Sequence, residues 1–407
     1  MIYTALIGHG VVGSGVAEIM TKQEKKLSES IKEDIKLKYI LDLRKFEGLP
    51  YSDKFINDFN IILNDDSVKV VVEVIGGLHP AFDFVKACLQ KGKSVVTSNK
   101  ELVAEKGYEL IKTANENNAN FLFEASVGGT IPIIRPLTQC LVANDIKEIY
   151  GILNGTTNYI LNKMIVDSMD FDTALKLAQN NGYAEKNPAS DIEGLDACRK
   201  ICILATLAFG KHIYPKDVSC EGITNVTLDD VAYADSFGYV IKLIGKAAKE
   251  ENGKISIGVA PTLVSKDEII SNVNGVYNAI MVKGDSCDDV MFYGRGAGKL
   301  PTASAVVADV VDCAKHLGAR KYISWEDSEE GFITEPLNST SYYVLCQNND
   351  FSSLKNSFKD IAENVVKSNI NEDKNEIAFI TKPVSKDLLN NILNSIKSNS
   401  TKTYKII

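Results

Sequence analysis

A glycine-rich turn near the N-terminus constrains the fold of this chain more than any other feature. The apolar stretch Ile2–Ile7 is typical of a short strand, and Gly8-His-Gly-Val-Val-Gly13 follows it directly. In such a G-x-G-x-x-G turn the first glycine allows the tight turn, the second lets the backbone approach a pyrophosphate, and the third lets a helix pack on the strand. The turn predicts a dinucleotide-binding unit, and a purely structural turn is the alternative. The residues expected at the phosphates are Gly8, Gly10, Val11, Val12 and Gly13.

Strands and helices alternate after this turn. Val68–Ile75 is a continuous β-branched run, as expected for a strand buried on both faces. A helix is predicted over Ala81–Lys91, a strand over Ser94–Thr97 and a second helix over Glu101–Asn117. This alternation predicts an α/β fold built on a doubly wound parallel sheet of the Rossmann type.

Several polar residues follow the predicted strands, and ligands of such a sheet bind outside the carboxyl ends of its strands. Asp42 comes directly after the predicted strand Leu37–Leu41. Lys100 would open a helix, where the macrodipole disfavours a cation, so a role at the ligand is favoured over a lysine that only faces solvent. The residues expected on this rim are Asp42, Arg44, Gly76, Ser98 and Lys100.

A second feature is a short span that gathers charged residues. From Gly182 to Lys200 the chain carries four carboxylates, which are Glu185, Asp191, Glu193 and Asp196. Ser190 and Glu193 form an S-x-x-E capping box, which predicts a helix that starts at Asp191.

Asp196 and Lys200 are four residues apart, so they share one face of that helix. The next stretch, Ile201–Phe209, is apolar nearly all round, which is typical of a buried helix. A solvated Asp–Lys pair is the alternative, and such exposed pairs contribute little. A lysine at the edge of a core can instead exchange a proton near neutral pH, so we expect Lys200 and Asp196 to line a catalytic cleft.

The composition excludes several functional classes. A chain of 407 residues suggests two or three domains. The net charge of −8, with no block of Lys and Arg, argues against a nucleic-acid partner. The longest apolar run is far shorter than the roughly 18 residues of a membrane span, so no membrane partner is expected. The N-terminus is expected to be a strand rather than a signal peptide. Eight scattered cysteines are typical of a reducing cytoplasm, and the four histidines have no metal-ligand spacing.

The middle of the chain predicts an α+β substrate domain. Lys147–Leu153 opens it, and Asn154-Gly-Thr-Thr-Asn158 is suited to cap the helix Tyr159–Asp167. Strand-like segments follow at Ile255–Val259 and Val276–Val282.

The last part of the chain is predicted to contain a long helix and a small α+β module. The glycine-rich stretch Gly294–Gly298 precedes the helix Thr302–Leu317, which is apolar enough to dock back on the first domain. From Ser341 onward a small α+β module is predicted, and an accessory extension without a ligand is the alternative. Its expected elements are a strand at Tyr342–Gln347, a helix at Leu354–Val366, a strand at Glu376–Thr381 and a helix at Leu388–Ile396.

Glu124 precedes a loop of small residues that runs to Ile131. Hard cations favour a carboxylate together with backbone carbonyls. The residues alone favour the other interpretation, a glycine-rich crossover loop without an ion.

In this order the motifs resemble the homoserine dehydrogenase family over roughly residues 1–325. The motifs that carry the resemblance are Gly8–Gly13, Glu73–Gly77, Ser98–Lys100, Asn154–Asn158, Gly182–Glu185 with Asp191, Asp196 and Lys200, and Gly294–Gly298 with Pro301 and Thr302. The resemblance implies interconversion of L-homoserine and L-aspartate 4-semialdehyde by hydride transfer with NAD or NADP, in the biosynthesis of threonine, methionine and isoleucine.

The resemblance also implies a role for each motif. Lys200 would be the proton-transferring lysine and Lys100 a second lysine at the substrate. Homoserine would be bound by Glu185 and Asp196, with Asp191 nearby. A sodium ion would be bound by Glu124 and the backbones of Val127, Gly129 and Ile131. Gly298 would lie in a loop that closes on the cofactor.

The choice between NAD and NADP depends on the end of the second strand. Leu41 stands where the family often has an arginine that contacts the NADP 2′-phosphate. Asp42 can hydrogen-bond a ribose 2′-hydroxyl, which favours NAD. Arg44 and Lys45 could pair the phosphate, so we expect use of both cofactors.

The tail resembles an ACT domain, a βαββαβ amino-acid-binding regulator, which implies threonine as a candidate ligand. The expected domains are 1–130 for the dinucleotide, completed by the helix 301–319, then 131–300 for the substrate and 335–407 for the ACT-like module. A homodimer or homotetramer is expected. Two other functions stay open, namely a dehydrogenase of another small amino-acid alcohol and a catalytically silent dinucleotide-binding amino-acid sensor.

Overall fold

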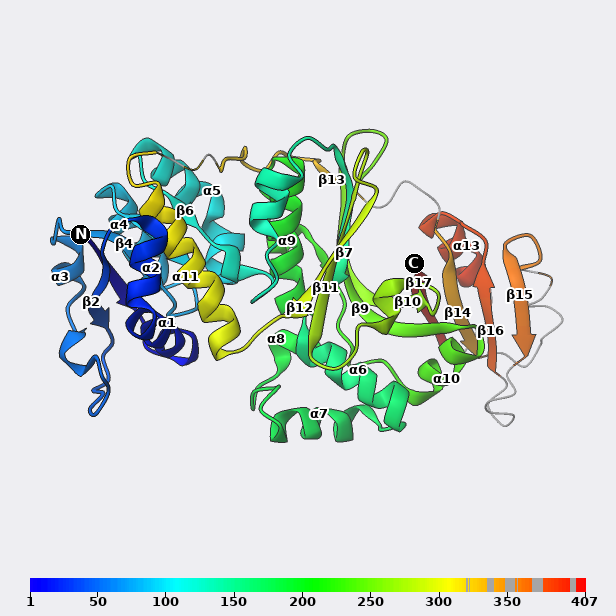
Figure 1. Cartoon of the computed structure of the whole chain (residues 1–407). Coiled ribbons are helices and arrows are strands. Elements are labelled where there is room, and N and C mark those ends of the chain that lie inside the picture. The colour runs from blue at the N-terminus through cyan, green and yellow to red at the C-terminus, as the bar shows by residue number, and fades with distance from the viewer. Residues whose placement is uncertain are drawn as a thin grey trace. The chain divides into compact units, whose positions relative to one another are not determined.

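The computed structural model describes residues 1–319, 321, 323–334, 340–347, 356, 358–367, 376–395 and 400–407 (Figure 1). Contacts between residues divide the chain into two units. Unit 1 comprises Met1–Ile146, Cys202–Asp217 and Lys283–Glu329. Unit 2 comprises Lys147–Ile201, Val218–Val282 and Glu330–Ile407. The boundary expected near residue 130 thus falls inside unit 1.

Unit 1 is built on a six-stranded parallel sheet with the order β3-β2-β1-β4-β5-β6. Its strands are β1 (Ile2–Ile7), β2 (Ile35–Leu41), β3 (Phe55–Ile56), β4 (Val68–Glu73), β5 (Ser94–Thr97) and β6 (Phe121–Leu122). This is the strand order of the doubly wound dinucleotide-binding fold, so the predicted fold class is confirmed. The order reverses between β1 and β4, and ligands of such sheets bind at that switch point.

Helices cover this sheet. They are α1 (Val11–Lys22), α2 (Glu24–Ile31), α3 (Phe59–Leu63), α4 (Ala81–Gln90), α5 (Lys100–Glu116) and α11 (Lys299–Lys315). Val16 of α1 and Val306 and Val310 of α11 share a buried cluster with Leu6 of β1. Gly15 lets the two helices approach, because a Cβ there would lie 2.9 Å from the Ala303 Cβ. Figure 1 shows α11, in yellow, beside α1.

Unit 1 also contains β12 (Asp289–Arg295) and three short turns of helix. The turns are η1 (Ser52–Lys54), η2 (Glu124–Ser126) and η4 (Pro215–Asp217), and a π-helical turn, η3, spans Pro136–Cys140. No helix in the described part of the chain is long and apolar enough to cross a membrane.

Unit 2 is a second α+β body around a mixed sheet. Its strands run in the order β11-β7-β9-β10, and β9 and β10 pair antiparallel along their whole length. The strands are β7 (Ile146–Ile152), β8 (Ser219–Cys220), β9 (Tyr239–Lys249), β10 (Ile255–Ser265), β11 (Tyr277–Gly284) and β13 (Ile333–Thr334). The helices are α6 (Gly155–Asp167), α7 (Phe171–Asn180), α8 (Ala189–Ile192) and α10 (Leu228–Ser236), with a short turn η5 (Ile269–Asn272). A further helix, α9 (Leu195–Phe209), begins in unit 2 and belongs to unit 1 from Cys202 onward.

The expected helix start at Asp191 is wrong, because the structure has two helices there. α8 ends at Ile192, and α9 begins only at Leu195. The carbonyl of Ile192 accepts a hydrogen bond from the Ile223 amide (2.8 Å) instead of from a continuing helix. Gly194 then takes a left-handed φ of 84°, which favours glycine. A side chain at this position would also lie 3.0 Å from the Cys220 Sγ.

The tail contributes four more strands to the sheet of unit 2, in the order β17-β14-β16-β15. Its elements are β14 (Tyr342–Gln347), β15 (Ala362–Lys367), β16 (Glu376–Thr381), α13 (Lys386–Ser395) and β17 (Ser400–Ile406). Most of the predicted helix Leu354–Val366 lies within the described residues, and its end is wrong because Ala362–Lys367 forms β15 and pairs with β16. Pairing within the sheet overrides the amphipathic pattern there.

The last strand joins the tail to the rest of unit 2. β17 pairs in parallel with β10, where Thr262 faces Lys405 and Leu263 faces Ile406. Lys402 Nζ donates to Asp230 Oδ2 (2.8 Å), as does the Tyr404 hydroxyl (3.2 Å). Asp230 is fully buried, so these two tail residues supply hydrogen bonds that its carboxylate needs.

His212 is a buried hydrogen-bonding centre of unit 1. Its Nε2 lies 2.9 Å from the Ala104 carbonyl, which can only accept, and Trp325 Nε1 donates to its Nδ1 (3.1 Å). Both ring nitrogens are therefore committed in the neutral form. Burial lowers the pKa of His212 below its ordinary value.

We expect acid to destabilise the chain through His212. Since the unfolded chain titrates at about pH 6.5 and the folded one lower, the free energy of unfolding falls as the pH drops below about 6.5. Thermal unfolding at about pH 8 and about pH 5.5 should therefore show a smaller acid-induced drop in Tm for His212→Gln than for the unchanged chain. His79→Gln, at an exposed histidine, serves as the control. An unchanged drop in His212→Gln would assign the effect to another group.

Candidate active site

The glycine turn at the end of β1 has the geometry expected of a phosphate-binding turn. Gly8 has a left-handed φ of 99°, and a Cβ on Gly13 would lie 2.1 Å from the Gly8 carbonyl oxygen. A Cβ on Gly10 would meet no atom within 4 Å, so open space lies there. Gly10 also caps α1 without a side chain, which leaves the amides of Val11 and Val12 at a bare helix N-terminus. Such a terminus favours an anion.

Asp42 and Arg44 form a linked pair beside this turn. The Asp42 carboxylate accepts from the His9 amide (2.8 Å) and from Arg44 Nε and Nη2 (3.0 and 2.9 Å). Hydrogen bonds from the Arg44 guanidinium hold the pKa of Asp42 well below its usual range. Arg44 Nη2 also donates to the His9 carbonyl (3.1 Å), so the arginine is fixed next to the glycine turn while its side chain stays 62% exposed.

Glu73 holds the loop after β4, a role that spacing alone did not reveal. Its carboxylate accepts from the amides of Ile75 (2.7 Å) and Gly76 (3.3 Å) and from the Thr97 hydroxyl (2.6 Å). Burial raises the pKa of Glu73 above its ordinary value. Side chains at Gly76 and Gly77 would enter open space, so this loop leaves room for a ligand.

The loop after β5 is tied to the loop after β4. The Asn99 amide donates to Thr97 Oγ1 (2.9 Å), and Asn99 Nδ2 donates to the Gly77 carbonyl (2.6 Å). Asn99 Oδ1 caps α5 by accepting from Leu102 (3.1 Å). Ser98 and Lys100, both half-buried, flank Asn99. The network thus fixes the backbone on either side of these two predicted site residues.

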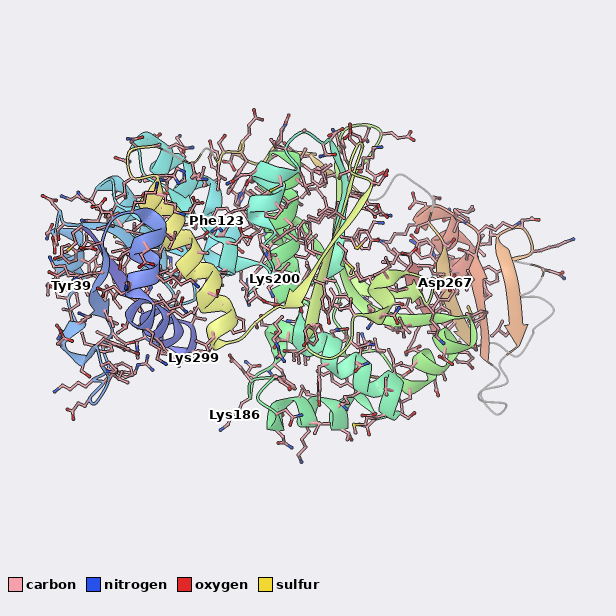
Figure 2. All side chains as sticks on the ribbon, in the orientation of Figure 1. Tyr39, Phe123, Lys186, Lys200, Asp267 and Lys299 are labelled. Atoms are coloured by element: carbon pink, nitrogen blue, oxygen red, sulfur yellow. The ribbon has the colours of Figure 1, made fainter. Side chains whose placement is uncertain are left out.

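Unit 2 brings three predicted site residues together around Asn154. Lys200 Nζ donates to Asp196 Oδ2 and to the Leu153 carbonyl, both at 2.8 Å. Asn154 Nδ2 donates to Asp191 Oδ1 (2.7 Å) and to the same Asp196 Oδ2 (2.8 Å). Lys200 is 7% exposed and Asp196 2% exposed, so the pair lies in the protein interior and not on a solvated helix face. Figure 2 labels Lys200 on α9.

This buried lysine–aspartate pair at the head of an apolar helix is suited to proton transfer. Asn154 was expected only as a helix cap, and its contacts to the carboxylates were not visible from its spacing. Glu185 differs from the other predicted residues, since its side chain is exposed and its backbone carbonyl accepts from Gln179 Nε2 (3.0 Å). The structure does not bring it into the buried cluster.

Comparison with known proteins identifies the family. A family model described as homoserine dehydrogenase matches residues 132–311, and one described as its NAD-binding domain matches residues 8–124. A homoserine dehydrogenase of Synechocystis is 43% identical over 349 residues, which are 84% of this chain and 78% of the relative. This chain belongs to the homoserine dehydrogenase family.

Solved homoserine dehydrogenases have the same fold. One from Thiobacillus denitrificans has a TM-score of 0.91 and 33% identity, over 100% of this chain and 98% of its own. A hyperthermophilic archaeal homoserine dehydrogenase, solved in complex with NADPH, has a TM-score of 0.65 and 28% identity, and it covers 77% of this chain with 97% of its own. Nearly the whole archaeal chain therefore aligns with this chain, whereas about a quarter of this chain has no counterpart in it.

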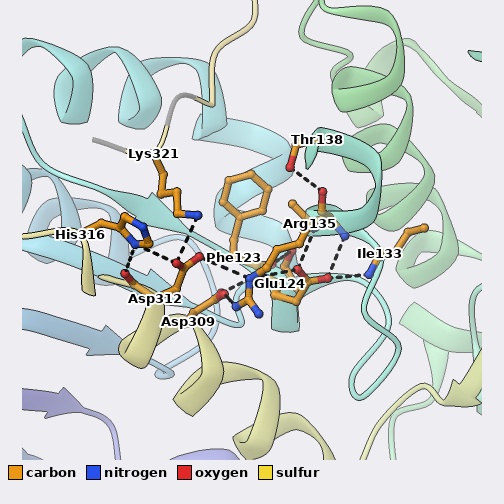
Figure 3. A network of polar contacts seen from close by, with 11 residues as sticks. Phe123, Glu124, Ile133, Arg135, Thr138, Asp309, Asp312, His316 and Lys321 are labelled. Atoms are coloured by element: carbon orange, nitrogen blue, oxygen red, sulfur yellow. Dashed lines mark hydrogen bonds and ion pairs between the residues drawn. The ribbon is translucent and has the colours of Figure 1, made fainter. Parts of the chain in front are cut away.

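Within this homoserine dehydrogenase fold, Glu124 is the centre of a buried network in unit 1 (Figure 3). Its carboxylate accepts from the amides of Ile133, Ile134 and Arg135, at 2.6, 2.8 and 3.0 Å. The Glu124 amide donates to Asp309 Oδ2 (2.8 Å), and Arg135 Nη2 donates to Asp309 Oδ1. The carboxylate thus caps the turn that follows the loop.

This arrangement changes which atoms could hold a cation. Both Glu124 oxygens already accept from backbone amides, so they suit a structural cap better than a metal ligand. In the described part of the chain, no amide donates to the carbonyls of Val127, Gly129 or Ile131. Backbone carbonyls are ligands that hard cations prefer, so a cation at this loop would be held by these carbonyls rather than by the carboxylate.

Gly298 forms the N-cap of α11, with a φ of 135° that favours glycine. A side chain there would lie 3.1 Å from Pro301 Cγ, so the turn before Pro301 is tight. Pro301 is the third residue of α11, because this helix begins at Lys299 and not at Thr302 as predicted.

Proposed function

We propose that this chain interconverts L-homoserine and L-aspartate 4-semialdehyde with NAD or NADP, on the route to threonine, methionine and isoleucine. The observation that carries the proposal is the buried Lys200–Asp196 pair, linked at 2.8 Å on α9. The doubly wound order of unit 1 and the family of the chain support it.

The chain's own residues supply binding and proton transfer in this proposal. The bound nicotinamide cofactor supplies the hydride chemistry. Lys200 takes the proton from the homoserine hydroxyl during oxidation and returns it to the same oxygen during reduction. Lys200 accepts that proton as a neutral amine and returns it as an ammonium. Asp196 keeps the Lys200 side chain in register in both states and, with Asp191 and Glu185, binds the amino acid. Lys100 is proposed as a second lysine of the reaction.

Lys200→Met should lower kcat by about 10²–10⁴-fold, the usual contribution of a positioned proton-transfer group. Dinucleotide affinity should stay close to that of the unchanged chain, because the glycine turn lies in unit 1. Asp196→Asn should raise KM for homoserine and also lower kcat. The measurement is NAD(P)H turnover with aspartate semialdehyde, with dinucleotide binding followed by fluorescence.

Lys246→Met is a matched control for this test. Lys246 also pairs with a carboxylate, Glu148 (2.8 Å), but on a partly exposed part of unit 2, so its loss should leave kcat unchanged. Near-normal kcat in Lys200→Met would remove Lys200 from the mechanism and leave Lys100 as the candidate. Absence of turnover in the unchanged chain would favour a silent amino-acid sensor.

For the cofactor we propose use of both NAD and NADP, with NAD favoured. Leu41 is buried and uncharged, and Asp42 suits a ribose hydroxyl. Arg44 is exposed and held beside the glycine turn, where it can pair a 2′-phosphate.

Arg44→Ala should lower kcat/KM with NADPH roughly tenfold or more relative to NADH, since a hydrogen bond to a charged group contributes about 1.5–3 kcal/mol. Lys45→Ala, measured in parallel, separates the two neighbouring cations. A strong preference for NADP that survives both substitutions would contradict this assignment.

The same assay tests the proposed sodium ion at the backbone carbonyls of Val127, Gly129 and Ile131. A lower rate and a lower Tm in choline chloride than in sodium chloride would support it. Equal values in the two salts would remove the ion from the proposal.

We also propose that residues 335–407 form an ACT-like regulatory module that responds to threonine. Every proposed catalytic residue precedes it, and the archaeal enzyme in complex with NADPH covers only 77% of this chain. We further propose a homodimer or homotetramer in the cytoplasm, which sedimentation analysis and cell fractionation would test.

Truncation before Ser341 should leave measurable activity and abolish any inhibition by threonine. Tm should fall, because loss of β17 uncovers the edge of β10 and removes Lys402 and Tyr404 from buried Asp230. Lys402→Met in the full chain is the control, and it should lower Tm while threonine still acts. A folded but wholly inactive truncated chain would contradict the proposed division of roles.

A further inference from the structure

Asn154 contacts two members of the proposed catalytic cluster, Asp191 and Asp196. It follows β7 and is the N-cap of α6, with an extended backbone (φ −130°, ψ 118°). It is 5% exposed, and its side chain donates to Asp191 on α8 and to Asp196 on α9, which in turn pairs with Lys200.

The orientation of the Asn154 amide follows from its partners. The Thr157 amide donates to Asn154 Oδ1 (2.8 Å), and a backbone amide can only donate. The Thr157 hydroxyl lies 3.0 Å from the same oxygen. Nδ2 must therefore point to the other side, where two carboxylate oxygens lie at 2.7 and 2.8 Å.

The two hydrogens of this NH₂ group match the two carboxylates. An amide nitrogen has two donors, and here each is directed to a different aspartate. Asp191 comes from a short helix in the loop and Asp196 from the start of α9, so the amide links two elements. Like charges brought this close repel, and a shared donor reduces that repulsion.

We propose that Asn154 is a positioning residue for the reaction, acting as a clamp that holds Asp191 and Asp196 at a fixed separation and so fixes Lys200 in register. The adjacent Leu153 carbonyl accepts from Lys200 Nζ. The two neighbouring residues Leu153 and Asn154 therefore position both Lys200 and Asp196. This inference rests on the proposed function of the cluster.

Asn154→Asp separates the clamp from the helix cap. Aspartate is as good an N-cap as asparagine, so its oxygen can still accept from the Thr157 amide. Its second oxygen replaces the NH₂ group and faces two carboxylates without a hydrogen to donate. Asn154→Ser also retains a capping oxygen and loses the NH₂ group without adding charge.

Both variants should lower kcat roughly 100-fold, the effect of a small misplacement of reacting groups. The dissociation constant for NADH or NADPH should not change. Only Asn154→Asp should recover as the pH is lowered from about 8 to about 6, because a proton shared among three clustered carboxylates restores a donor. A merely structural role would produce no such recovery.

The control is Asp170→Asn, which exchanges acid for amide at the exposed N-cap of α7 and should leave kcat and its pH profile unchanged. If Asn154→Asp fails to fold, Asn154→Ser decides. Kcat within about twofold of the unchanged chain in a folded variant overturns the clamp. No turnover of aspartate semialdehyde by the unchanged chain refutes the proposed function instead, so the two failures are distinguishable.

Discussion

The most demanding interaction in unit 2 is the buried pair of the Lys200 ammonium with the Asp196 carboxylate. A charge removed from water needs a partner charge and hydrogen bonds to remain in the interior. Here the Asp196 carboxylate and the Leu153 carbonyl supply both, each at 2.8 Å. The break between α8 and α9 at Gly194 places Asp196 in the first turn of its helix, where the macrodipole also favours a carboxylate.

A second buried lysine, Lys242, is held by neutral oxygen atoms. Lys242 on β9 donates to the Val273 carbonyl (2.7 Å) and to the side-chain oxygens of Asn274 (3.1 Å) and Asn158 (3.3 Å). Burial lowers the pKa of Lys242 to about 8. Asn154 and Asn158 are the two ends of one short motif. Asn158 accepts from the buried Lys242, and Asn154 donates to the aspartate that pairs with the buried Lys200.

Unit 1 uses buried carboxylates in a different way. Glu73 and Glu124 each follow or end a strand of the parallel sheet, and each accepts hydrogen bonds from backbone amides of the next loop. A carboxylate in this position fixes the loop at the carboxyl edge, where a ligand of such a sheet binds. The family resemblance implied a sodium ion at Glu124, whereas both oxygens of its carboxylate accept from backbone amides in the structure.

Much of the fold could be predicted because apolar strands carry their own signal. β1, β5, β14 and β16 have the predicted bounds, since each is a short run rich in apolar residues. The helix start at Asp191 failed because a distant amide, that of Ile223, takes the Ile192 carbonyl. β17 was missed because Ser400–Ile406 is polar and becomes a strand only by pairing with β14 and β10. The contacts of Asn154 with Asp191 and Asp196 were missed for the same reason, because they join residues far apart in sequence.

The pairing of β17 with β10 has a consequence for how this chain acquires its structure during synthesis. β10 leaves the ribosome long before β17, and until then part of one edge of β10 has no partner. Exposed strand edges pair readily with other chains. Contacts of such high sequence separation also form slowly, because a long loop must close first. Unit 2 therefore cannot complete its sheet as it emerges, and the nascent chain has to protect that edge until its last strand is available.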